Sequence, residues 1–516
     1  MNKIKTALIS VSDKTGLIEL AQKLNKLDIK ILSTGGSAKA LQDSNIPVTE
    51  VSEHTKFPEM LDGRVKTLNP IIHGGILAKR NNDKHLKTIQ KNGIELIDLV
   101  IINLYPFVKT IENPNSTFED AIENIDIGGP AMIRSSAKNH ADVAIITEPK
   151  DYDFIIKELE DNDGKLSLDT KKQLAIKAFK HTSEYDNAIY NYLSNNKEEI
   201  FPKSLHLKFE KDIEMRYGEN PHQKAAFYKH KTDYEGALSN FNQLQGKELS
   251  FNNLNDAETA WECVKNLNEN SCVIVKHANP CGVASDRTIM ESYLKAFKTD
   301  PTSAFGGIIA FNNLVDEQTA MEINNQFAEL IIAPEFSKKA LEVFSAKRNL
   351  RLLQIPNVKG HDPFDIKKIG GGILLQTPDH INFDINDCKI VSNLKPTPDQ
   401  LTDMSFAWHV AKYVKSNAII FCKDKMTLGV GAGQMSRVDS TRIAAIKAEN
   451  ASRNLSSSVV ASDAFFPFRD GIDVLAQYGA KCVIQPGGSM RDDEVIQAAN
   501  EHNLVMLFTN IRHFKH

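Results

Sequence analysis

The chain has 516 residues, of which 41% are hydrophobic and 25% are charged, and its formal net charge is −4. This length exceeds what one compact core holds, so we expect a globular protein of two or more domains. The balanced charge excludes nucleic-acid binding as the main activity, and the most apolar stretch, residues 94–107, is interrupted by Glu95, Asp98 and Asn103, which excludes a membrane span.

The sequence predicts a cytoplasmic protein with free thiols. The apolar run that follows Met1 is too short for a secretory signal and is typical of a first strand. The six cysteines contain no C-x-x-C pair. Neither a disulfide framework nor a zinc site is therefore expected, and a reducing compartment is.

The first two hundred residues alternate short apolar runs with helical patterns, which is typical of an α/β parallel sheet. Strands are predicted at four places: 6–11, 29–33, 97–103 and 142–147. Apolar residues recur at helical spacing in one group: Leu17, Ile18, Leu20, Ala21, Leu24 and Leu27. A second, long helix is predicted from Asp169 to about Ser194.

The polar segment 195–199, followed by Phe201-Pro202-Lys203-Ser204, marks the predicted domain boundary. Domains are therefore expected at 1–199 and 200–516. The second is large, and we expect it to form two subdomains, although no residue-by-residue internal repeat is evident in it.

Two loops of the first domain, Ser10–Gly16 and Ser33–Ser37, combine hydroxyls and glycines at the start of a helix. Free backbone N–H groups and the helix dipole bind phosphate at such positions. Neither loop has the spacing of a Walker motif. One such loop is usually a structural cap, but two in succession favour an anion site.

Arg64 and Lys66 would share a face if their stretch were a strand, although a solvated surface pair is the simpler interpretation of these residues alone. Tyr105 follows the apolar run 97–103, at the strand end where α/β sheets bind ligands. A buried core tyrosine is the equal alternative.

Asp126 precedes a Gly128-Gly129 helix start, and Lys138 lies further along that helix in an orientation that the spacing leaves open. With Lys66 and Tyr105 they would place a carboxylate, a phenol and two ammoniums around one anionic ligand. Such groups exchange protons and stabilise an oxyanion without a metal.

In the second domain, the apolar run 272–275 predicts a strand that ends at Lys276 and His277, before a turn at Asn279-Pro280. An ammonium beside an imidazole suits a reaction that moves a proton while charge develops on oxygen. The nearby string is similar to the zinc-deaminase pattern H-x-E…P-C-x-x-C, but Asn279 replaces the acid and no second cysteine follows. A zinc hydrolase is therefore disfavoured.

With these loops in view, the chain resembles, nearly end to end, the bifunctional purine biosynthesis family that joins aminoimidazole carboxamide ribonucleotide (AICAR) formyltransferase to inosine monophosphate (IMP) cyclohydrolase. The matching blocks are SVSDKTG (10–16), STGGSAK (33–39), GRVKTLNP (63–70), NLYPF (103–107), IDIGGPAMIRSSAKNH (125–140), RYGENPHQ (216–223), KHANPCG (276–282), DPTSAFGG (300–307), SNAI (416–419), GVGAGQMSRVDSTR (429–442) and SDAFFPFRDG (462–471).

The resemblance implies a methylglyoxal-synthase-like α/β first domain and a second domain of two cytidine-deaminase-like subdomains without zinc. It also implies a homodimer whose transferase sites are built at the subunit interface. The implied co-substrate is 10-formyltetrahydrofolate; no catalytic metal is expected, and a bound monovalent cation is compatible with the family.

For formyl transfer onto AICAR, the resemblance implies His277 as general base, Lys276 as the group that stabilises the oxyanion and Asn417 as an orienting amide. The ribonucleotide would be held by Arg216, Tyr217 and Arg437. The folate would lie against Phe468 and Asp470, although a row of phenylalanines often forms only core.

For ring closure of formylated AICAR to IMP, the implied catalytic groups are Lys66, Tyr105, Asp126 and Lys138, with acid and base roles left open among them. The nucleotide would be received by Ser12, Lys14, Thr34, Gly35, Gly36, Arg64 and Thr67. Two rival classes are a metal-dependent nucleotide deaminase and a non-catalytic nucleotide sensor; the second leaves Lys276 and His277 without a role.

Overall fold

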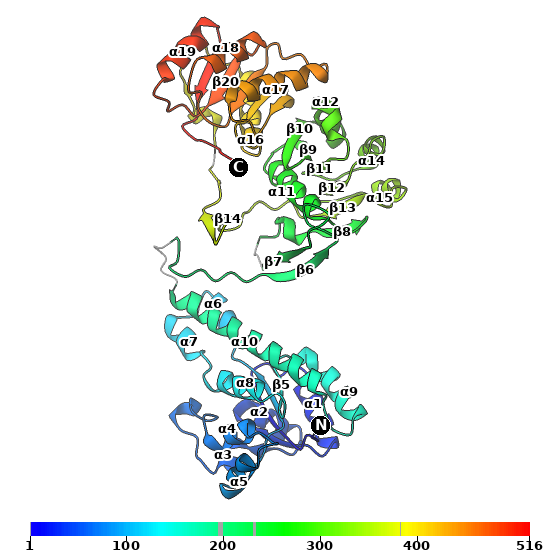
Figure 1. Cartoon of the computed structure of the whole chain (residues 1–516), viewed down its shortest axis with the longest axis vertical. Coiled ribbons are helices and arrows are strands. Elements are labelled where there is room, and N and C mark those ends of the chain that lie inside the picture. The colour runs from blue at the N-terminus through cyan, green and yellow to red at the C-terminus, as the bar shows by residue number, and fades with distance from the viewer. Residues whose placement is uncertain (1, 195–199, 231–233, 382) are drawn as a thin grey trace. The chain divides into compact units, whose positions relative to one another are not determined.

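The computed structural model describes residues 2–194, 200–230, 234–381 and 383–516. The chain divides into two compact units, Met1–Leu207 (unit 1) and Lys208–His516 (unit 2) (Figure 1). The polar segment 195–199, where the sequence predicts the boundary, lies outside the described residues. Each unit has its own sheets and hydrophobic clusters, so each has its own core.

Unit 1 is built on a five-stranded parallel sheet with the order β3-β2-β1-β4-β5. Its strands are β1 Thr6–Val11, β2 Lys30–Ser33, β3 Thr49–Glu50, β4 Leu99–Asn103 and β5 Ala144–Ile146. The predicted parallel sheet and its first strand are confirmed. Because the strand order reverses between β1 and β4, a ligand crevice is expected at the carboxyl ends of these two strands.

Helices cover both faces of this sheet, and one hydrophobic cluster lies on each face. The predicted helical spacing is confirmed in α1, which buries Leu17, Leu20, Ala21 and Leu24. The helices of unit 1 are α1 Leu17–Lys26, α2 Gly35–Asp43, α3 Val51–Thr55, α4 Pro70–Leu77, α5 Asp83–Lys91, α6 Phe107–Glu112, α7 Phe118–Glu123, α8 Gly128–Lys138, α9 Tyr152–Asp161 and α10 Leu168–Ser194.

Unit 2 contains a twelve-stranded mixed sheet with the order β16-β21-β20-β19-β17-β18-β10-β9-β11-β12-β13-β8. Its strands are β8 Asn242–Gln245, β9 Asn270–Lys276, β10 Asn279–Asp286, β11 Ile308–Phe311, β12 Leu330–Ala333, β13 Arg351–Gln354, β16 Lys389–Ile390, β17 Ile419–Lys423, β18 Met426–Gly431, β19 Val459–Ser462, β20 Cys482–Gln485 and β21 Val505–Phe508. Two separate hairpins pair β6 Glu210–Met215 with β7 Ala225–Lys229, and β14 Asp365–Ile369 with β15 Gly372–Gln376.

The helices of unit 2 fall into two similar sets that cover the large sheet (Figure 1). The first set is α11 Phe251–Lys265, α12 Ile289–Thr299, α13 Pro301–Ala304, α14 Glu317–Asn324 and α15 Lys338–Ser345. The second set is α16 Pro398–Ala411, α17 Arg437–Asn450, α18 Asp470–Gln477 and α19 Asp492–Glu501.

The same succession of elements occurs twice in unit 2. A helix, an antiparallel hairpin and further helix–strand pairs run from α11 to β13 and again from α16 to β21. The halves meet where β10 pairs with β18. Asp256 and Trp261 in α11 correspond to Asp403 and Trp408 in α16, 147 positions later in both cases (403 − 256 and 408 − 261). The structure thus shows a duplication that the sequence alone does not.

Glycine permits close packing of both hairpins against the helix that follows. A methyl group on Gly282 in β10 would lie 2.0 Å from the Ala296 carbonyl oxygen of α12. One on Gly429 in β18 would lie 2.3 Å from the Ala444 carbonyl oxygen of α17. A side chain at either position would therefore push the hairpin off its helix.

The six cysteines are free, as predicted, and all but Cys388 are buried. Burial raises the pKa of each thiol, to about 12 for Cys263 and to about 11 for Cys388, so they are protonated at neutral pH. In the part of the chain that the structure describes, no helix is both long and apolar enough to cross a bilayer.

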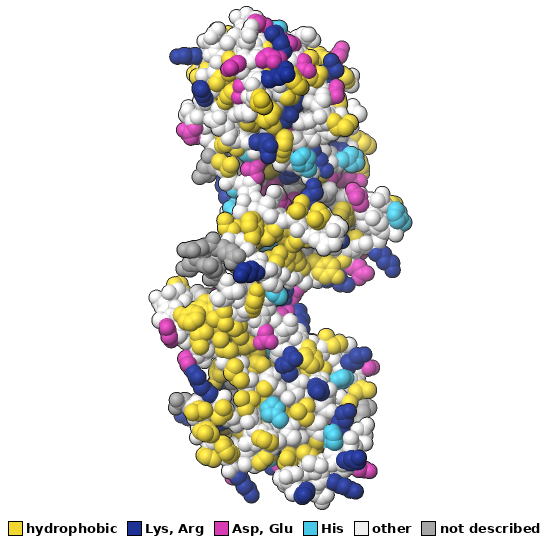
Figure 2. Space-filling view, turned by 60° about the vertical axis from the view of Figure 1, so that its left-hand side comes forward, with side chains coloured by type: hydrophobic (Ala, Val, Ile, Leu, Met, Phe, Trp, Pro, Cys, Tyr) yellow, Lys and Arg dark blue, Asp and Glu magenta, His cyan; other side chains and the backbone are white. Residues whose placement is uncertain are grey.

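Apolar side chains gather on one surface of unit 1 (Figure 2). This surface, called here the α6–α7 patch, lies over α6, α7 and the end of α10. Its exposed members are Val108, Phe118, Tyr190 and Leu193, and the Phe118 ring stacks on that of Tyr192 at 6.1 Å. Contiguous exposed apolar surface of this kind marks an interaction site.

Candidate active sites

The carboxyl ends of β1 and β4 in unit 1 are joined by one amide side chain. Asn103 Oδ1 accepts hydrogen bonds from the backbone N–H of Ser12 at 2.7 Å and of Asp13 at 2.9 Å. The Ser12 hydroxyl donates to the Leu104 carbonyl at 2.6 Å. These contacts fix the predicted phosphate loop at the point where the strand order reverses.

Two ammonium groups flank the Gly35-Gly36 start of α2. A methyl group on Gly35 would lie 3.8 Å from Lys66 Nζ, and one on Gly36 would lie 3.7 Å from Lys14 Nζ. Thr34, the N-cap residue, is hydrogen-bonded to the Ser10 hydroxyl at 3.0 Å. Two cations, free N–H groups and a helix N-terminus lie at one place, which is the arrangement expected of an anion site, and the sequence predicts such a site from two separate loops.

The start of α8 lies against the same region. Thr67 is so close to Gly128 that a methyl group there would be 2.3 Å from Thr67 Oγ1. Asp126 accepts a hydrogen bond from the Gly129 N–H at 2.8 Å and another from the backbone of Tyr105. Burial nevertheless raises the pKa of Asp126 above its usual range, which suits a group that exchanges a proton.

The remaining predicted residues of unit 1 differ in how they are placed. The Tyr105 side chain is 55% exposed, so it is not the core tyrosine of the alternative interpretation. Lys66 is bound to Glu59 at 2.6 Å, and Arg64 is paired with Glu123 at the surface; neither cation lies in a strand. Lys138 ends the eleven-residue helix α8, about 15 Å along its axis from Gly128. Its side chain is exposed, and its position relative to the other three groups stays a prediction.

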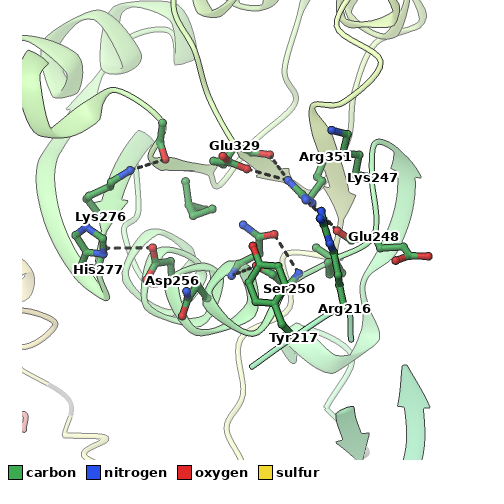
Figure 3. Close-up of a pocket in the computed structure, with 15 residues that line it drawn as sticks. Arg216, Tyr217, Lys247, Glu248, Ser250, Asp256, Lys276, His277, Glu329 and Arg351 are labelled. Carbon is green, nitrogen blue, oxygen red and sulfur yellow. Dashed lines mark hydrogen bonds and ion pairs between the residues drawn. The ribbon is translucent and has the colours of Figure 1, made fainter. Parts of the chain in front are cut away.

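Unit 2 contains a pocket of about 440 Å³, a volume typical of a small-molecule site (Figure 3). It is lined by residues that follow β6, by the start of α11, by the end of β9 and by the edges of β11, β12 and β13. The polar lining residues used below are Arg216, Tyr217, Lys247, Glu248, Asp256, Lys276, His277, Glu329 and Arg351.

Lys276 and His277 lie side by side on one wall of the pocket (Figure 3). The Lys276 ammonium donates to the carbonyls of Gly306 at 2.9 Å and Phe305 at 3.3 Å. His277 and Ala278 form the two-residue turn between β9 and β10, and both have positive φ, 56° and 53°. The prediction of a turn at Asn279-Pro280 is wrong, because those two residues already pair with Lys276 and Val275 in the hairpin.

The opposite wall of the pocket is cationic (Figure 3). Arg216 contacts the ring of Tyr217, with the guanidinium 5.7 Å from the ring centroid. Arg351 is held by Glu329 at 2.9 Å and by the Glu248 carbonyl. An anionic group bound at this wall would leave the rest of its molecule pointing toward Lys276 and His277.

Asn417 is linked to the pocket wall through a neighbouring amide. Asn279, next to the His277–Ala278 turn, accepts a hydrogen bond from the Lys415 backbone at 3.0 Å, two residues before Asn417. The Asn417 side chain itself donates to the Gln434 carbonyl at 2.8 Å. The two halves of unit 2 thus meet at the β9–β10 hairpin.

Three other predicted residues are not among those that line the pocket. Arg437 begins α17 and is bound to buried Asp463 at 3.1 Å, with its side chain only 12% exposed. Phe468 is 47% exposed and contacts the Arg491 guanidinium, while Phe466 of the same motif is core. Asp470 begins α18, where it accepts a hydrogen bond from the next residue's N–H.

Comparison with known proteins decides the family. The model described as "AICARFT/IMPCHase bienzyme" matches residues 136–447, and the model of an MGS-like domain matches residues 16–131. The chain belongs to the AICARFT/IMPCHase bienzyme family. The predicted pair of activities, AICAR formyltransferase and IMP cyclohydrolase, the last two steps of purine biosynthesis, is confirmed, as is the predicted fold of the first domain.

A curated relative of this bienzyme supports the assignment along the whole chain. The bifunctional purine biosynthesis protein PurH of Polynucleobacter asymbioticus is 57% identical over 525 residues, which cover 99% of this chain and 100% of PurH. The crystal structure of ForH matches 37% of this chain and 99% of its own at 34% identity, with a TM-score of 0.33. That score is too low to say anything about the fold.

Several residues of the bienzyme's pocket were missed by the sequence reasoning. Lys247, Asp256, Glu329 and Arg351 line it beside the predicted groups. One signal was available in the sequence: Ser250 and Asn253 form a capping box that begins α11 at Phe251, and Asp256 lies in the second turn of that helix. No comparable signal identifies Glu329 or Arg351, which reach the pocket from separate strands.

Proposed function

We propose that unit 1 performs the ring closure and unit 2 the formyl transfer, with 10-formyltetrahydrofolate as the formyl donor. The observation that supports this division is the presence of a separate cluster of charged and titratable groups in each unit. Unit 1 has two ammoniums over a helix N-terminus and a half-buried carboxyl, and unit 2 has a pocket with an ammonium and an imidazole on one wall.

In formyl transfer, the exocyclic amine of AICAR attacks the formyl carbon and gives up a proton. His277 takes that proton, because an imidazole titrates near neutral pH and this one is exposed in the pocket. Lys276 stabilises the oxygen that becomes negative. The bond from the formyl carbon to the folate nitrogen then breaks, and that nitrogen takes a proton as tetrahydrofolate leaves.

The ribonucleotide phosphate is assigned to the cationic wall, with Arg216 as its bidentate partner and Tyr217 beside it. Asn417 orients the reacting groups from the adjacent hairpin. Arg437 is assigned to the nucleotide, and Phe468 and Asp470 to the folate. These last three lie outside the pocket lining of the single chain, which is the reason to propose that a second copy contributes them.

In ring closure, the carboxamide nitrogen of formylated AICAR attacks its own formyl carbon, and water leaves. Both reacting groups belong to one molecule, so the protein has only to fix its conformation and manage charge. Lys66 is assigned to the developing oxygen anion, and Tyr105, Asp126 and Lys138 to proton transfer. The phosphate and ribose are assigned to residues of the first two loops and of the segment after the 3-10 helix η1 (Leu61–Gly63), namely Ser12, Lys14, Thr34, Gly35, Gly36, Arg64 and Thr67.

The working form proposed is a cytoplasmic homodimer with transferase sites built at the subunit interface. The exposed α6–α7 patch supports association with another protein surface. The proposed chemistry uses no catalytic metal. A monovalent cation is compatible with the proposal, in a structural role only.

Two full-length variants test the division of labour. His277→Ala should lose formyl transfer and keep ring closure, and Lys66→Met should do the reverse. Transfer is measured as tetrahydrofolate formation, and closure as IMP formation from supplied formylated AICAR. His230→Ala, which removes an imidazole outside the pocket lining, is the matched control. Loss of both activities in either variant would contradict the assignment.

A further inference from the structure

The two hairpins of unit 2 are fastened in the same way. In the first, the Asp256 carboxylate of α11 accepts hydrogen bonds from the N–H groups of His277 at 3.2 Å and Ala278 at 2.7 Å. In the second, the Asp403 carboxylate of α16 accepts from both turn residues, Asp424 at 2.9 Å and Lys425 at 2.7 Å. Each aspartate thus holds both N–H groups of a two-residue turn.

Such a turn needs fastening because of its backbone conformation. His277 and Ala278 have φ values of 56° and 53°, and Asp424 and Lys425 both have 52°. Two successive left-handed residues form the I′ turn, which strongly favours asparagine and glycine. With a histidine and an alanine there, the turn is strained, and two charge-assisted bonds from one carboxylate offset that strain.

The two turns differ in what they carry. The first lies in the pocket wall, with His277 at its first position and Asp256 among the lining residues (Figure 3). The second carries Asp424 and Lys425 and is not part of the described pocket. The duplication therefore supplies an internal comparison in which the same fastening is present without the imidazole.

We propose that Asp256 is a positioning residue for formyl transfer: by holding the strained His277–Ala278 turn, its carboxylate fixes the imidazole in the pocket. This inference rests on the proposed role of His277 as the base. A base works only within hydrogen-bond reach of the proton it removes, and a displacement of about 1 Å costs about a hundredfold in rate. A turn released from Asp256 would let the ring occupy several positions, few of them productive.

Asp256→Asn tests the proposal because it keeps the shape of the side chain and replaces one acceptor oxygen by an NH₂ group. We expect kcat for formyl transfer to fall about 10- to 100-fold, with KM for AICAR and the rate of ring closure unchanged. Asp403→Asn makes the same change at the second hairpin and should leave kcat for transfer unchanged. Asp256→Glu keeps the charge but shifts the carboxylate by one methylene, and should lose about tenfold even if the asparagine variant does not fold.

Adding Ala278→Gly distinguishes positioning from a purely structural or electrostatic role. Glycine adopts positive φ without strain, so the turn of Asp256→Asn/Ala278→Gly needs less fastening. This double variant should recover most of the lost kcat.

The inference is overturned if Asp256→Asn or Asp256→Glu transfers at the wild-type rate, if Asp403→Asn loses as much as Asp256→Asn, or if Ala278→Gly brings no recovery. His277→Ala separates this from a failure of the proposed function. If that variant transfers formyl groups normally, the base itself is wrongly assigned, whereas an inactive His277→Ala with a fully active Asp256→Asn removes only the positioning role.

Discussion

Replacement of Lys276 by methionine is the sharpest test of the transfer chemistry. The Lys276 ammonium donates to the Gly306 carbonyl at 2.9 Å and to the Phe305 carbonyl at 3.3 Å, which hold it at the edge of the pocket. Methionine keeps a stem of similar length and removes only the charge and the donors. The variant therefore isolates what the ammonium does for the oxygen of the formyl group.

The size of the effect follows from when that charge develops. The formyl oxygen is neutral in the bound substrate and becomes negative only as the amine attacks, so the ammonium acts mainly on kcat. Removal of one donor to such an oxygen costs about 2.7–4 kcal/mol, or roughly 10²- to 10³-fold in kcat. The two carbonyls lose a partner, but Gly306 lines the pocket and Phe305 is exposed, so water can replace the ammonium and stability should fall by only about 1 kcal/mol.

The assay compares tetrahydrofolate formation by wild type and Lys276→Met over a range of AICAR concentrations. Lys247→Met is the matched control, because this lysine lines the same pocket on the opposite, cationic wall. Loss of its charge is expected to change KM more than kcat. Ring closure of supplied formylated AICAR should be unchanged in both variants. If Lys276→Met changes only KM, or loses less than about threefold in kcat, the ammonium does not stabilise the transition state as argued.

Three further predictions concern unit 1 and the thiols. Burial raises the pKa of Asp126, so the folded protein favours the protonated carboxyl. The stability that this preference contributes is fully present below the pKa of Asp126 in the unfolded chain, and it is lost as the pH rises through its pKa in the folded protein. Asp126→Asn removes the group proposed to exchange a proton and should abolish ring closure. Asparagine stays neutral at every pH, so thermal melts should show the variant more stable relative to wild type at about pH 7 than at about pH 4. Gly35→Ala, at φ 46° and with its methyl 3.8 Å from Lys66 Nζ, should raise KM for formylated AICAR about tenfold, measured by IMP formation. Ellman's reagent at neutral pH should react slowly with Cys388 alone in the native protein and with all six cysteines after denaturation.

The parallel sheet of unit 1 could be predicted from the sequence because its strands and helices are encoded by patterns of neighbouring residues. Strands such as Thr6–Val11 are short apolar runs between helical patterns, and strand ends carry the polar loops. The loops around Ser12 and Gly35 also belong together for a local reason: parallel strands bring their carboxyl ends to one edge.

The features that were not predicted depend on contacts between distant residues. The His277–Ala278 turn was placed two residues late because Asn-Pro is the stronger local turn signal. What fixes the turn is Asp256, 21 positions earlier, together with pairing along β9. The grouping of Lys138 with Lys66, Tyr105 and Asp126 rests on the motif, because the spacing along α8 does not say which way its side chain points.

The duplication in unit 2 escaped the sequence reasoning for a different reason. A fold of this kind requires few identical residues, and here the shared ones include an aspartate bonded to the turn, an Ala-Trp pair in the core, the lysine that ends the first hairpin strand and a glycine at a close approach. A few scattered identities among more than a hundred positions give no periodic signal. They become visible only when the structure aligns the two hairpins.

The two candidate sites are built differently, and the two reactions explain why: ring closure takes place within one molecule, whereas formyl transfer joins two. Ring closure joins two groups of one molecule, so holding the nucleotide is most of the task, and under the proposed division unit 1 would do this with helix N-termini, glycines and lysines at the end of a parallel sheet. Formyl transfer joins two molecules and must remove a proton from a poor nucleophile. That reaction needs a base and a cation at fixed positions, which a tight hairpin turn fastened to a helix provides better than a flexible loop does. In both halves the first strand of the hairpin ends in a lysine, Lys276 or Lys423, but the first turn position is His277 in one half and Asp424 in the other, and only the first hairpin borders the described pocket.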